Sequence, residues 1–540
     1  MSATTMKKAI SPMNRLILFV MVSATQLLWA VAHAAAPGIT GPTFALTAQP
    51  AYLSQPDGQT VYSWGYGCAV APAGFAPGAI TTTFCSTMQV PGPTLIVTEG
   101  QTVTVNLTNG LPTAAGNTSI LFPGFNVTTS GGVAGLLTKE AAPGGTVTYT
   151  FTAGSPGTRA YYSGTQGDLQ VEMGLYGAII VLPSTIPATC TTGLAASNLT
   201  AEAFNGESDF RLAAAAYDHP STCYDREYLF QFSEIDPNIH NLALAQVTAK
   251  AGCLVTSSAC QLEVPTEPYH PAYFLINGRS MPDDMDSNYA PQYPHQPYNG
   301  NPHMHPGELT LLRIIGQGRW QHPFHEHGNH VRILGRDGNL ILSQSDPNSL
   351  AGPLLFTTTT TPGLAMDGIF YWTGKGLNWD AYGHNPASQD LTAKLPCTPD
   401  ANGYNTAAPT AINYYEWCQD HNKPVQAAPF GDLPAGGPVT LPDPNLFTNG
   451  AWYGGSPYLG PNATLRATGC SPGVAAGLCG ATGSTPPSGT IANSPSGEAG
   501  FAFMWHSHNE REITTNNIFP GGMLMMMLVD SREFQIDESN

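Results

Sequence analysis

Short runs in which apolar and polar residues alternate recur along the chain. Residues 145–151 alternate at every position, with apolar side chains between threonines. That period of two is typical of a β-strand with one buried face. Residues 95–109 are rich in Val, Thr and Leu on both sides of Glu99-Gly100, which predicts two strands joined by a turn. Residues 176–182 are almost wholly apolar and predict a strand buried on both faces.

The same succession of segments occurs twice, an internal repeat that predicts two units of one architecture. The first unit contains, in order, the strands around Glu99-Gly100, Leu121-Phe-Pro-Gly124, residues 143–151, Tyr161-Tyr-Ser-Gly164 and residues 172–181. The second contains residues 306–314, His325-Glu-His-Gly328, residues 362–372, Trp505-His-Ser-His508 and residues 520–529. We therefore expect a first domain over residues 35–190 and a second over residues 191–540.

Composition supports an all-β fold and adds an insertion. The chain of 540 residues has 58 Gly and 47 Pro, and stretches with helical periodicity are scarce. Residues 377–497 have no counterpart in the first unit, are rich in Gly, Pro, Ser, Asn and Ala, and carry four Cys. They predict a long loop-rich insertion. A third β-domain in this segment is the alternative.

The N-terminal residues 1–34 have the features of a signal peptide. Lys7, Lys8 and Arg15 precede an apolar run at residues 16–32, and Ala32-His33-Ala34 fits a cleavage site. A membrane anchor is the alternative for this run, and no later segment is long and apolar enough to span a bilayer. We expect a secreted or periplasmic protein.

The ten Cys all follow that leader, and an even number in an exported chain predicts disulfides. Their spacing suggests five short-range pairs: Cys68–Cys85, Cys190–Cys223, Cys253–Cys260, Cys397–Cys418 and Cys470–Cys479. With all five formed, no thiolate is left for a metal or for nucleophilic catalysis.

Charge excludes some partners. The formal net charge is −18, yet only 10% of residues are charged, so the acidic surface is sparse. Such a chain is not expected to bind nucleic acid or an anionic membrane surface.

Histidine is concentrated in the second unit. Of 15 His, one lies in the leader and the next is His219, so the first unit has none. His325 and His327 form one His-x-His pair, and His506 and His508 form another. Residues i and i+2 of a strand share a face, so each pair presents two imidazoles side by side. Imidazole is a good ligand for copper, zinc, iron and nickel, and the four residues predict a metal site.

Other side chains near these pairs in sequence extend the candidate site. His322, His303 and His305 are possible additional metal ligands. Glu510 and Glu512 follow His508 and are candidates for acid–base groups or for groups that orient the ligands. The alternative is that the histidines are buried hydrogen-bonding groups that hold no metal.

Taken together, these motifs resemble the multicopper oxidase family, which is built from cupredoxin β-sandwiches. Val90-Pro-Gly-Pro-Thr-Leu95 is similar to the opening of a family first domain, and His322-Pro-Phe-His-Glu-His-Gly328 is the most specific match. The resemblance covers most of residues 40–375 and 497–530. It implies an all-β protein of tandem cupredoxin-like Greek-key β-sandwiches with copper as cofactor. It also implies that His322 corresponds to a type-1 copper ligand, His325 to a type-2 ligand, and His327, His506 and His508 to type-3 ligands.

The chain departs from that family pattern at several other ligand positions. Ser507 stands where the family has the type-1 Cys, and Glu512 stands where it has another type-1 His. Leu121-Phe-Pro-Gly124 and Tyr162-Ser-Gly164 replace the first-unit His-x-His motifs. A blue site with a complete trinuclear cluster therefore cannot be assembled in one chain. We expect His325, His327, His506 and His508 to converge inside the second sandwich as a reduced, histidine-only copper site.

These observations predict an exported, copper-binding oxidoreductase of the multicopper oxidase type. Its partner would be a small-molecule or metal-ion reductant, and it could form homo-oligomers. The alternatives are a copper-binding or copper-buffering protein without turnover and a structural protein that uses the cupredoxin fold alone.

Overall fold

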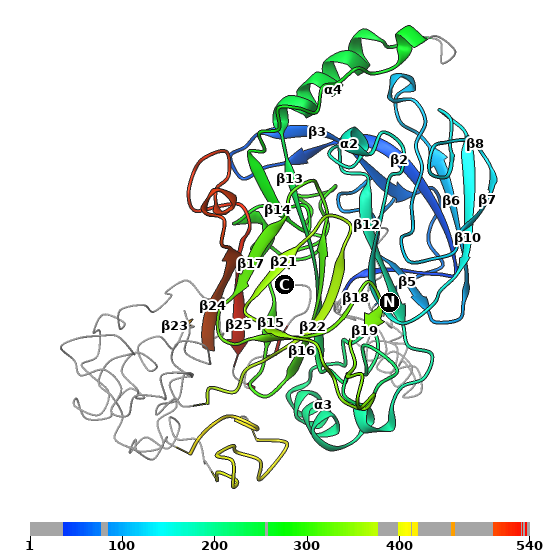
Figure 1. The fold of residues 1–540 in the computed structure, drawn as a ribbon. Coiled ribbons are helices and arrows are strands. Elements are labelled where there is room, and N and C mark those ends of the chain that lie inside the picture. Colours follow the sequence, from blue (N-terminus) through cyan, green and yellow to red (C-terminus); the bar gives the residue numbers. More distant parts are fainter. Residues whose placement is uncertain are drawn as a thin grey trace, which may run out of the picture.

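The strands of the protein form two β-sandwiches that lie side by side, as the computed structural model shows (Figure 1). The structure describes residues 36–76, 85–253, 258–375, 398–411, 413–419, 455–458, 500–530, 532 and 535–536. In Figure 1 the first sandwich runs from blue to cyan and the second from green to red. The prediction of an all-β fold with tandem sandwiches is confirmed.

The first sandwich consists of two five-stranded sheets. One has the order β11-β12-β5-β1-β4 and the other β3-β2-β6-β10-β7. Their bounds are β1 Gly38–Thr40, β2 Thr43–Ser54, β3 Thr60–Cys68, β4 Gly74–Ala76, β5 Leu95–Thr98, β6 Thr102–Asn109, β7 Thr128–Gly131, β10 Thr146–Thr152, β11 Gly157–Tyr162 and β12 Tyr176–Leu182. The alternating run at residues 145–151 becomes β10, and its apolar side chains are buried in the core between the sheets.

The second sandwich packs a seven-stranded sheet against a six-stranded sheet. The first has the order β14-β13-β16-β22-β18-β19, with β20 paired to β18, and the second β15-β25-β24-β17-β21, with β23 paired to β24. Their bounds are β13 Arg226–Ile235, β14 Tyr273–Ile276, β15 His303–Met304, β16 Leu309–Gly316, β17 His322–Glu326, β18 Val331–Arg336, β19 Asn339–Leu340, β20 Leu354–Leu355, β21 Thr357–Thr360, β22 Ala365–Tyr371, β23 Gly455–Tyr458, β24 Gly500–Ser507 and β25 Leu524–Asp530. Aromatic and Met side chains, among them Trp505 and Met525, fill the space between the two sheets.

Helices are few and lie outside the sandwiches. They are α2 Gly167–Gln170, α3 Gly193–Asn205 and α4 Pro237–Ala249, with short 3-10 turns at Thr113–Ala115, Ala188–Thr191, Ser258–Cys260, Asp283–Met285 and Glu510–Ile513. A two-stranded hairpin joins β8 Val133–Ala134 to β9 Lys139–Glu140. Among the described helices, none is long and apolar enough to cross a membrane.

Three of the five predicted disulfides are confirmed: Cys68–Cys85, Cys190–Cys223 and Cys253–Cys260. Cys418 is also disulfide-bonded, and its expected partner Cys397 lies outside the described residues. The pair Cys470–Cys479, the leader and most of the predicted insertion lie outside them as well. No cysteine in the described part of the chain has a free thiol.

A buried carboxylate ties the two sandwiches together. Asp367 of β22 accepts hydrogen bonds from the backbone N–H and the hydroxyl of Thr158 in β11, at 3.0 and 2.6 Å. The Tyr217 hydroxyl donates to it at 2.7 Å, and the Arg313 guanidinium lies 3.5 Å away. Asp367 has no exposed surface, so these contacts are what stabilise its charge in the interior.

A second buried network fixes the segment after α3 to the second sandwich. The carboxylate of Glu207 lies 2.7 Å from both Arg226 of β13 and Nε2 of His305. Arg226 also pairs with Glu308 at 2.8 Å. Burial alone would raise the pKa of Glu207, but His305 and Arg226 outweigh it and lower the pKa to about 2.

We expect Asp367→Ala to destabilise the protein by about 3–5 kcal/mol, because it leaves Arg313 and the Thr158 donors without their buried acceptor. Chemical denaturation measures the change. The control is Glu267→Ala, which removes a carboxylate that is 72% exposed and pairs with Arg319; we expect a loss of about 1 kcal/mol or less. Equal losses in the two variants would contradict the role given to Asp367.

Glu207→Gln should change how stability depends on pH. The folded-state pKa of about 2 lies below the ordinary value of 4.5, so the carboxylate stabilises the protein above pH 4.5 and this contribution fades as pH falls towards 2. We expect the variant to lose about 3 kcal/mol at pH 7 and the difference from wild type to vanish near pH 2. Denaturant titrations at pH 7, 4 and 2.5 test this. A difference that is the same at all three values would refute it.

Candidate metal centre

The pairing of β17 with β24 brings the two His-x-His motifs together. The strands are antiparallel, and His325 lies directly opposite His506, with Glu326 opposite Trp505. The backbone N–H of His508 donates to the Pro323 carbonyl at 2.8 Å, so the pairing continues beyond the end of β24. Opposite residues of a ladder share a face, which places all four imidazoles on the same side of the sheet.

The four rings form one compact cluster. The His325 ring centroid lies 4.8 Å from that of His327, 5.7 Å from that of His506 and 4.7 Å from that of His508. The His506 centroid lies 5.2 Å from His327 and 5.0 Å from His508. The shortest contact joins the Nε2 atoms of His327 and His506, at 3.2 Å. We call these residues the four-histidine cluster.

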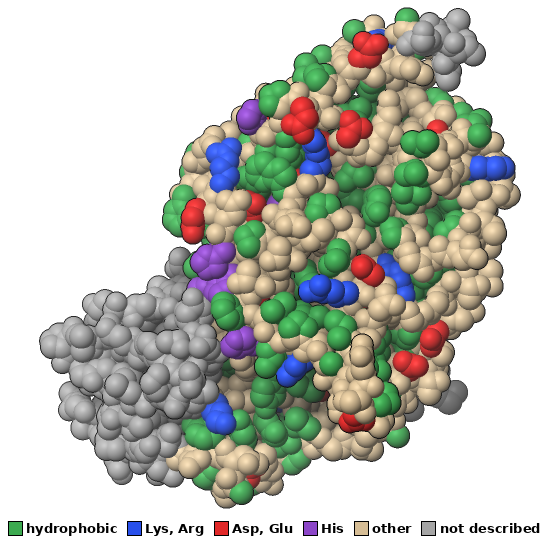
Figure 2. Space-filling view, in the orientation of Figure 1, with side chains coloured by type: hydrophobic (Ala, Val, Ile, Leu, Met, Phe, Trp, Pro, Cys, Tyr) green, Lys and Arg blue, Asp and Glu red, His purple; other side chains and the backbone are tan. Residues whose placement is uncertain are grey.

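The cluster lies on the outer face of its sheet, which corrects the expectation that it converges inside the second sandwich. Phe324 and Trp505 alternate with the histidines along their strands, and both are part of the core between the sheets. Neighbouring residues of a strand point to opposite faces, so the imidazoles point away from that core. His508 is exposed and His327 half-buried, while His325 and His506 are buried. Figure 2 shows histidine side chains gathered on this face of the molecule.

Hydrogen bonds fix the orientation of two of the rings. Nδ1 of His506 lies 2.8 Å from the Ser507 carbonyl, so it carries the proton and Nε2 presents its lone pair. Nδ1 of His325 lies 2.9 Å from the Thr357 hydroxyl, which makes Nε2 the nitrogen able to bind a metal. Such contacts through the second ring nitrogen are typical of histidine ligands.

Two of the imidazoles, those of His325 and His506, have a lowered pKa. Burial, and after it the neighbouring rings of His327, His508 and His506, lower the pKa of His325 to about 4. Burial also lowers the pKa of His506. A neutral imidazole has the lone pair that a metal ion needs, so these two residues are ready to act as ligands at neutral pH.

The other predicted ligands lie elsewhere. His303 and His305 belong to the segment around β15, and β25 separates β15 from β24. Nδ1 of His303 pairs with Asp530 at 2.6 Å, and His305 joins the Glu207 network. The structure therefore does not bring either residue to the four-histidine cluster.

His322 and Glu512 also lie apart from the cluster, on the core side of β17 and β24. Nε2 of His322 lies 3.0 Å from Glu234, and Nδ1 lies 2.9 Å from Glu512. Burial would lower the pKa of His322, but the two carboxylates outweigh it and raise the pKa to about 9. Glu510 is exposed, in the 3-10 turn that follows His508.

Two residues that support these histidines were not predicted from the sequence. Glu234 is in β13, 88 positions from His322, and Thr357 is in β21, 32 positions from His325. Neither belongs to a recognisable motif, and only sheet pairing and packing bring them close. The His-x-His spacing carries no information about them.

The first sandwich contains the same strand pairing but has no histidine at the corresponding positions. Leu121 and Tyr162 form an antiparallel bridge, with the Leu121 N–H donating to the Tyr162 carbonyl at 2.7 Å. In the repeat, Leu121 corresponds to His325 and Tyr162 to His506. This face packs against the second sandwich: a Cβ at Gly363 would lie 3.3 Å from the Tyr162 hydroxyl. The first unit therefore has the same strand pairing as the second but no imidazoles.

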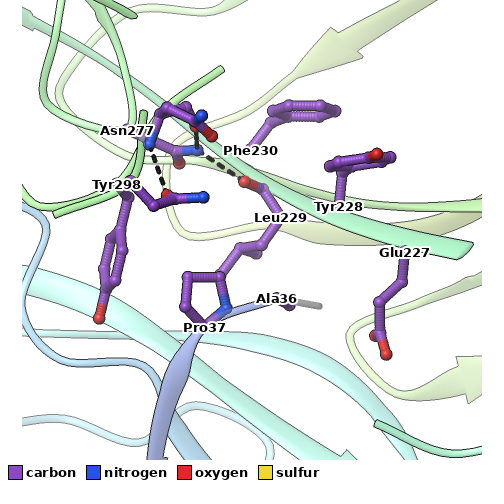
Figure 3. Close-up of a pocket in the computed structure, with 10 residues that line it drawn as sticks. Ala36, Pro37, Glu227, Tyr228, Leu229, Phe230, Asn277 and Tyr298 are labelled. Atoms are coloured by element: carbon purple, nitrogen blue, oxygen red, sulfur yellow. Dashed lines mark hydrogen bonds between the residues drawn. The ribbon is translucent and has the colours of Figure 1, made fainter. Parts of the chain in front are cut away.

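A separate pocket lies where the described chain begins, next to β13 (Figure 3). Ala36, Pro37, Tyr228 and Asn277 are among its lining residues. The Asn277 amide donates to the Leu229 carbonyl at 2.7 Å, which Figure 3 shows as a dashed line. Its polar side chains serve the local backbone, and we assign it no ligand.

Within the described residues, no three His, Cys, Asp or Glu side chains are already arranged to hold an ion. The four-histidine cluster has the donors and the proximity, but its present geometry is not one that holds an ion.

Comparison with known proteins places the first sandwich in a family. A family model described as multicopper oxidase matches residues 75–185. Over 96 residues the chain is 40% identical to an L-ascorbate oxidase from Brassica rapa subsp. pekinensis, covering 17% of this chain and 16% of that protein. Over 98 residues it is 38% identical to multicopper oxidase MCE from Talaromyces pinophilus, covering 18% and 15%. The chain thus aligns with less than a fifth of the length of either relative.

Among solved structures, a blue copper oxidase from Nitrosomonas europaea is similar over 90% of this chain and 85% of its own. The TM-score is 0.43 and the sequence identity 15%.

The residues around Ser507 predict the colour of the copper-loaded protein. A blue site needs a Cys thiolate, and the side chain here is a hydroxyl, so we expect no intense blue absorption band. The double variant Ser507→Cys/Glu512→His should acquire such a band, because it restores a thiolate and a second imidazole beside His322. Ser507→Cys alone is the matched control. A blue wild-type protein, or a colourless double variant with bound copper and normal stability, would contradict this assignment.

Proposed function

The chain belongs to the multicopper oxidase family, and on that premise we propose that it is an exported copper-dependent oxidoreductase with a reduced, histidine-only copper site. The ligands are His325, His327, His506 and His508. The substrate class is a small-molecule or metal-ion reductant.

One observation carries this proposal: four imidazoles from two paired strands converge at the protein surface. Their chemistry suits copper. The 3.2 Å between Nε2 of His327 and Nε2 of His506 is close to the separation of two nitrogens on one ion with bonds of about 2 Å. This pair would bind first, and rotation of the His325 and His508 rings would complete the set.

Bound copper would supply one-electron exchange with the reductant. The chain's own residues supply access and orientation. His508 is exposed and His327 half-buried, so a small reductant can reach the site without passing through the core. The Thr357 hydroxyl orients the His325 ring, and the Ser507 carbonyl holds His506 in the tautomer that leaves its Nε2 free to bind an ion.

Electrons would enter at this site directly. In the family the type-1 copper passes electrons to the oxygen-reducing centre, and here Ser507 and Glu512 occupy two of its ligand positions. Glu510, exposed next to His508, is our candidate for the acid–base group.

Export is part of the same proposal. Disulfides persist in oxidising compartments, and three are present in the described chain. We propose residues 1–34 as the signal peptide, residues 35–190 as the first domain and residues 191–540 as the second.

His325→Ala and His506→Ala should each lower copper affinity at least tenfold, because each removes a ligand whose ring is held in place by a hydrogen bond through its other nitrogen. His270→Ala is the matched control: its side chain is exposed and outside the cluster, so copper binding should not change. Copper stoichiometry after gel filtration, with thermal melting to confirm folding, is the measurement. Full copper content in both cluster variants would exclude the site.

Oxygen consumption by the copper-loaded protein, with phenolic or metal-ion reductants, distinguishes turnover from storage. We expect steady consumption that His506→Ala abolishes and His270→Ala leaves intact. Stoichiometric copper without consumption would instead assign the protein to copper binding or buffering.

A further inference from the structure

Two methionines lie opposite each other on the outer face of the sheet that carries the four-histidine cluster. In the β24–β25 ladder Met504 is directly opposite Met526. Their neighbours along the strands, Trp505, Met525 and Met527, belong to the core between the sheets. Side chains alternate along a strand, so Met504 and Met526 point away from that core. Both are half-buried. We call these two residues the thioether pair.

The register brings the two sulfur atoms within reach of one ion. Directly opposite residues of an antiparallel ladder have Cβ atoms about 4.5–5.5 Å apart. Bonds from sulfur to a first-row metal are about 2.3 Å long, so two sulfurs on one ion lie up to roughly 4.6 Å apart. The methionine side chain is unbranched and has three rotatable bonds, which lets both sulfurs turn towards a shared ion without any movement of the strands.

The same row of the sheet adds an imidazole. The β17–β24 ladder pairs Glu326 with Trp505. One residue further, the same register sets His327 against Met504. The two strands are still in contact there, because the Trp505 indole N–H donates to the His327 carbonyl at 2.9 Å. His327, Met504 and Met526 thus follow one another across three neighbouring strands and share one face of the sheet.

The surroundings of the thioether pair favour a cation of low charge. The outward-facing residues next to it on β24 and β25 include Ala502, Leu524 and Leu528, all apolar. Transfer of an ion from water to such surroundings becomes more costly as its charge increases, so a monovalent cation is tolerated better than a divalent one. Thioether sulfur is a soft, uncharged donor that selects copper(I) over hard ions.

We propose that Met504 and Met526, with the His327 imidazole as third donor, form a binding site for a soft monovalent cation of the copper(I) type. The two sulfurs distinguish this donor set from the four-histidine cluster, whose donors are all nitrogen. His327 is common to both sets, which places the two sites side by side. The identity of the cation as copper rests on the function proposed above, whereas binding of a soft monovalent cation does not.

Silver(I), which has the same charge and softness and no redox chemistry under these conditions, is the probe. It is titrated by calorimetry in chloride-free buffer into the full chain carrying His325→Ala/His506→Ala, which removes two imidazoles of the cluster. We expect one silver ion per chain. Adding Met504→Leu or Met526→Leu should weaken its binding about tenfold or more, because each removes a ligand. Absence of silver binding by the folded background protein would overturn the proposal.

Two sets of control variants in the same background separate the site from its surroundings. Met525→Leu/Met527→Leu changes the same strand on its core face and conserves side-chain volume, so silver affinity should not change. His327→Ala should weaken silver binding, whereas His508→Ala, which lies outside the row, should not. Silver affinity that falls as much in the core variant as in the thioether variants would refute the site, as would affinity that Met504→Leu and Met526→Leu leave unchanged.

Metal binding by the intact cluster distinguishes failure of this inference from failure of the proposed function. In Met504→Leu/Met526→Leu we expect normal copper(II) stoichiometry and a weakened affinity for copper(I), measured without oxygen against a copper(I) chelator. Normal copper(II) binding with unchanged copper(I) affinity would overturn this inference alone. Loss of silver on replacing the two methionines, in a wild-type protein that binds no copper(II), would support the thioether site and refute the histidine-only copper site.

Discussion

The antiparallel pairing of β17 with β24 is the constraint on which the chemistry of this protein depends. His325 lies opposite His506, so the two His-x-His pairs share one face of the sheet. Side chains alternate with a period of two, so a shift of one residue in one strand would send two of the four imidazoles into the core. Trp505 and Phe324 resist such a shift, because both are packed between the sheets of the second sandwich.

The same pairing creates two environments, one on each face of the sheet. On the outer face four imidazoles lie close together and partly open to solvent, and burial lowers the pKa of His325. On the inner face His322 lies between two buried carboxylates, next to the Ser507 hydroxyl. The oxygen atoms of Ser507 and Glu512 provide no thiolate, so this position does not suit blue copper.

The first sandwich shows that the fold does not require the metal ligands. Leu121 and Tyr162 are bridged as His325 and His506 are, yet neither can bind copper through a nitrogen. Their face is covered by the second sandwich, whereas the four-histidine cluster faces outward. Function in such a repeat depends on which copy keeps an accessible face, because packing alone maintains the strands of both.

The sequence by itself determined the strands, three confirmed disulfides and the two His-x-His pairs, since these depend on local periodicity and spacing. The alternating run at residues 145–151 became β10, as its pattern predicted. Only the tertiary structure decided which face the histidines occupy, because period-two spacing cannot tell the core side from the solvent side. The tertiary structure also pairs His303 with Asp530, His305 with Glu207 and His322 with Glu234. Those partners are 88 or more positions apart in the chain, and no local pattern connects residues that only sheet pairing and packing bring together.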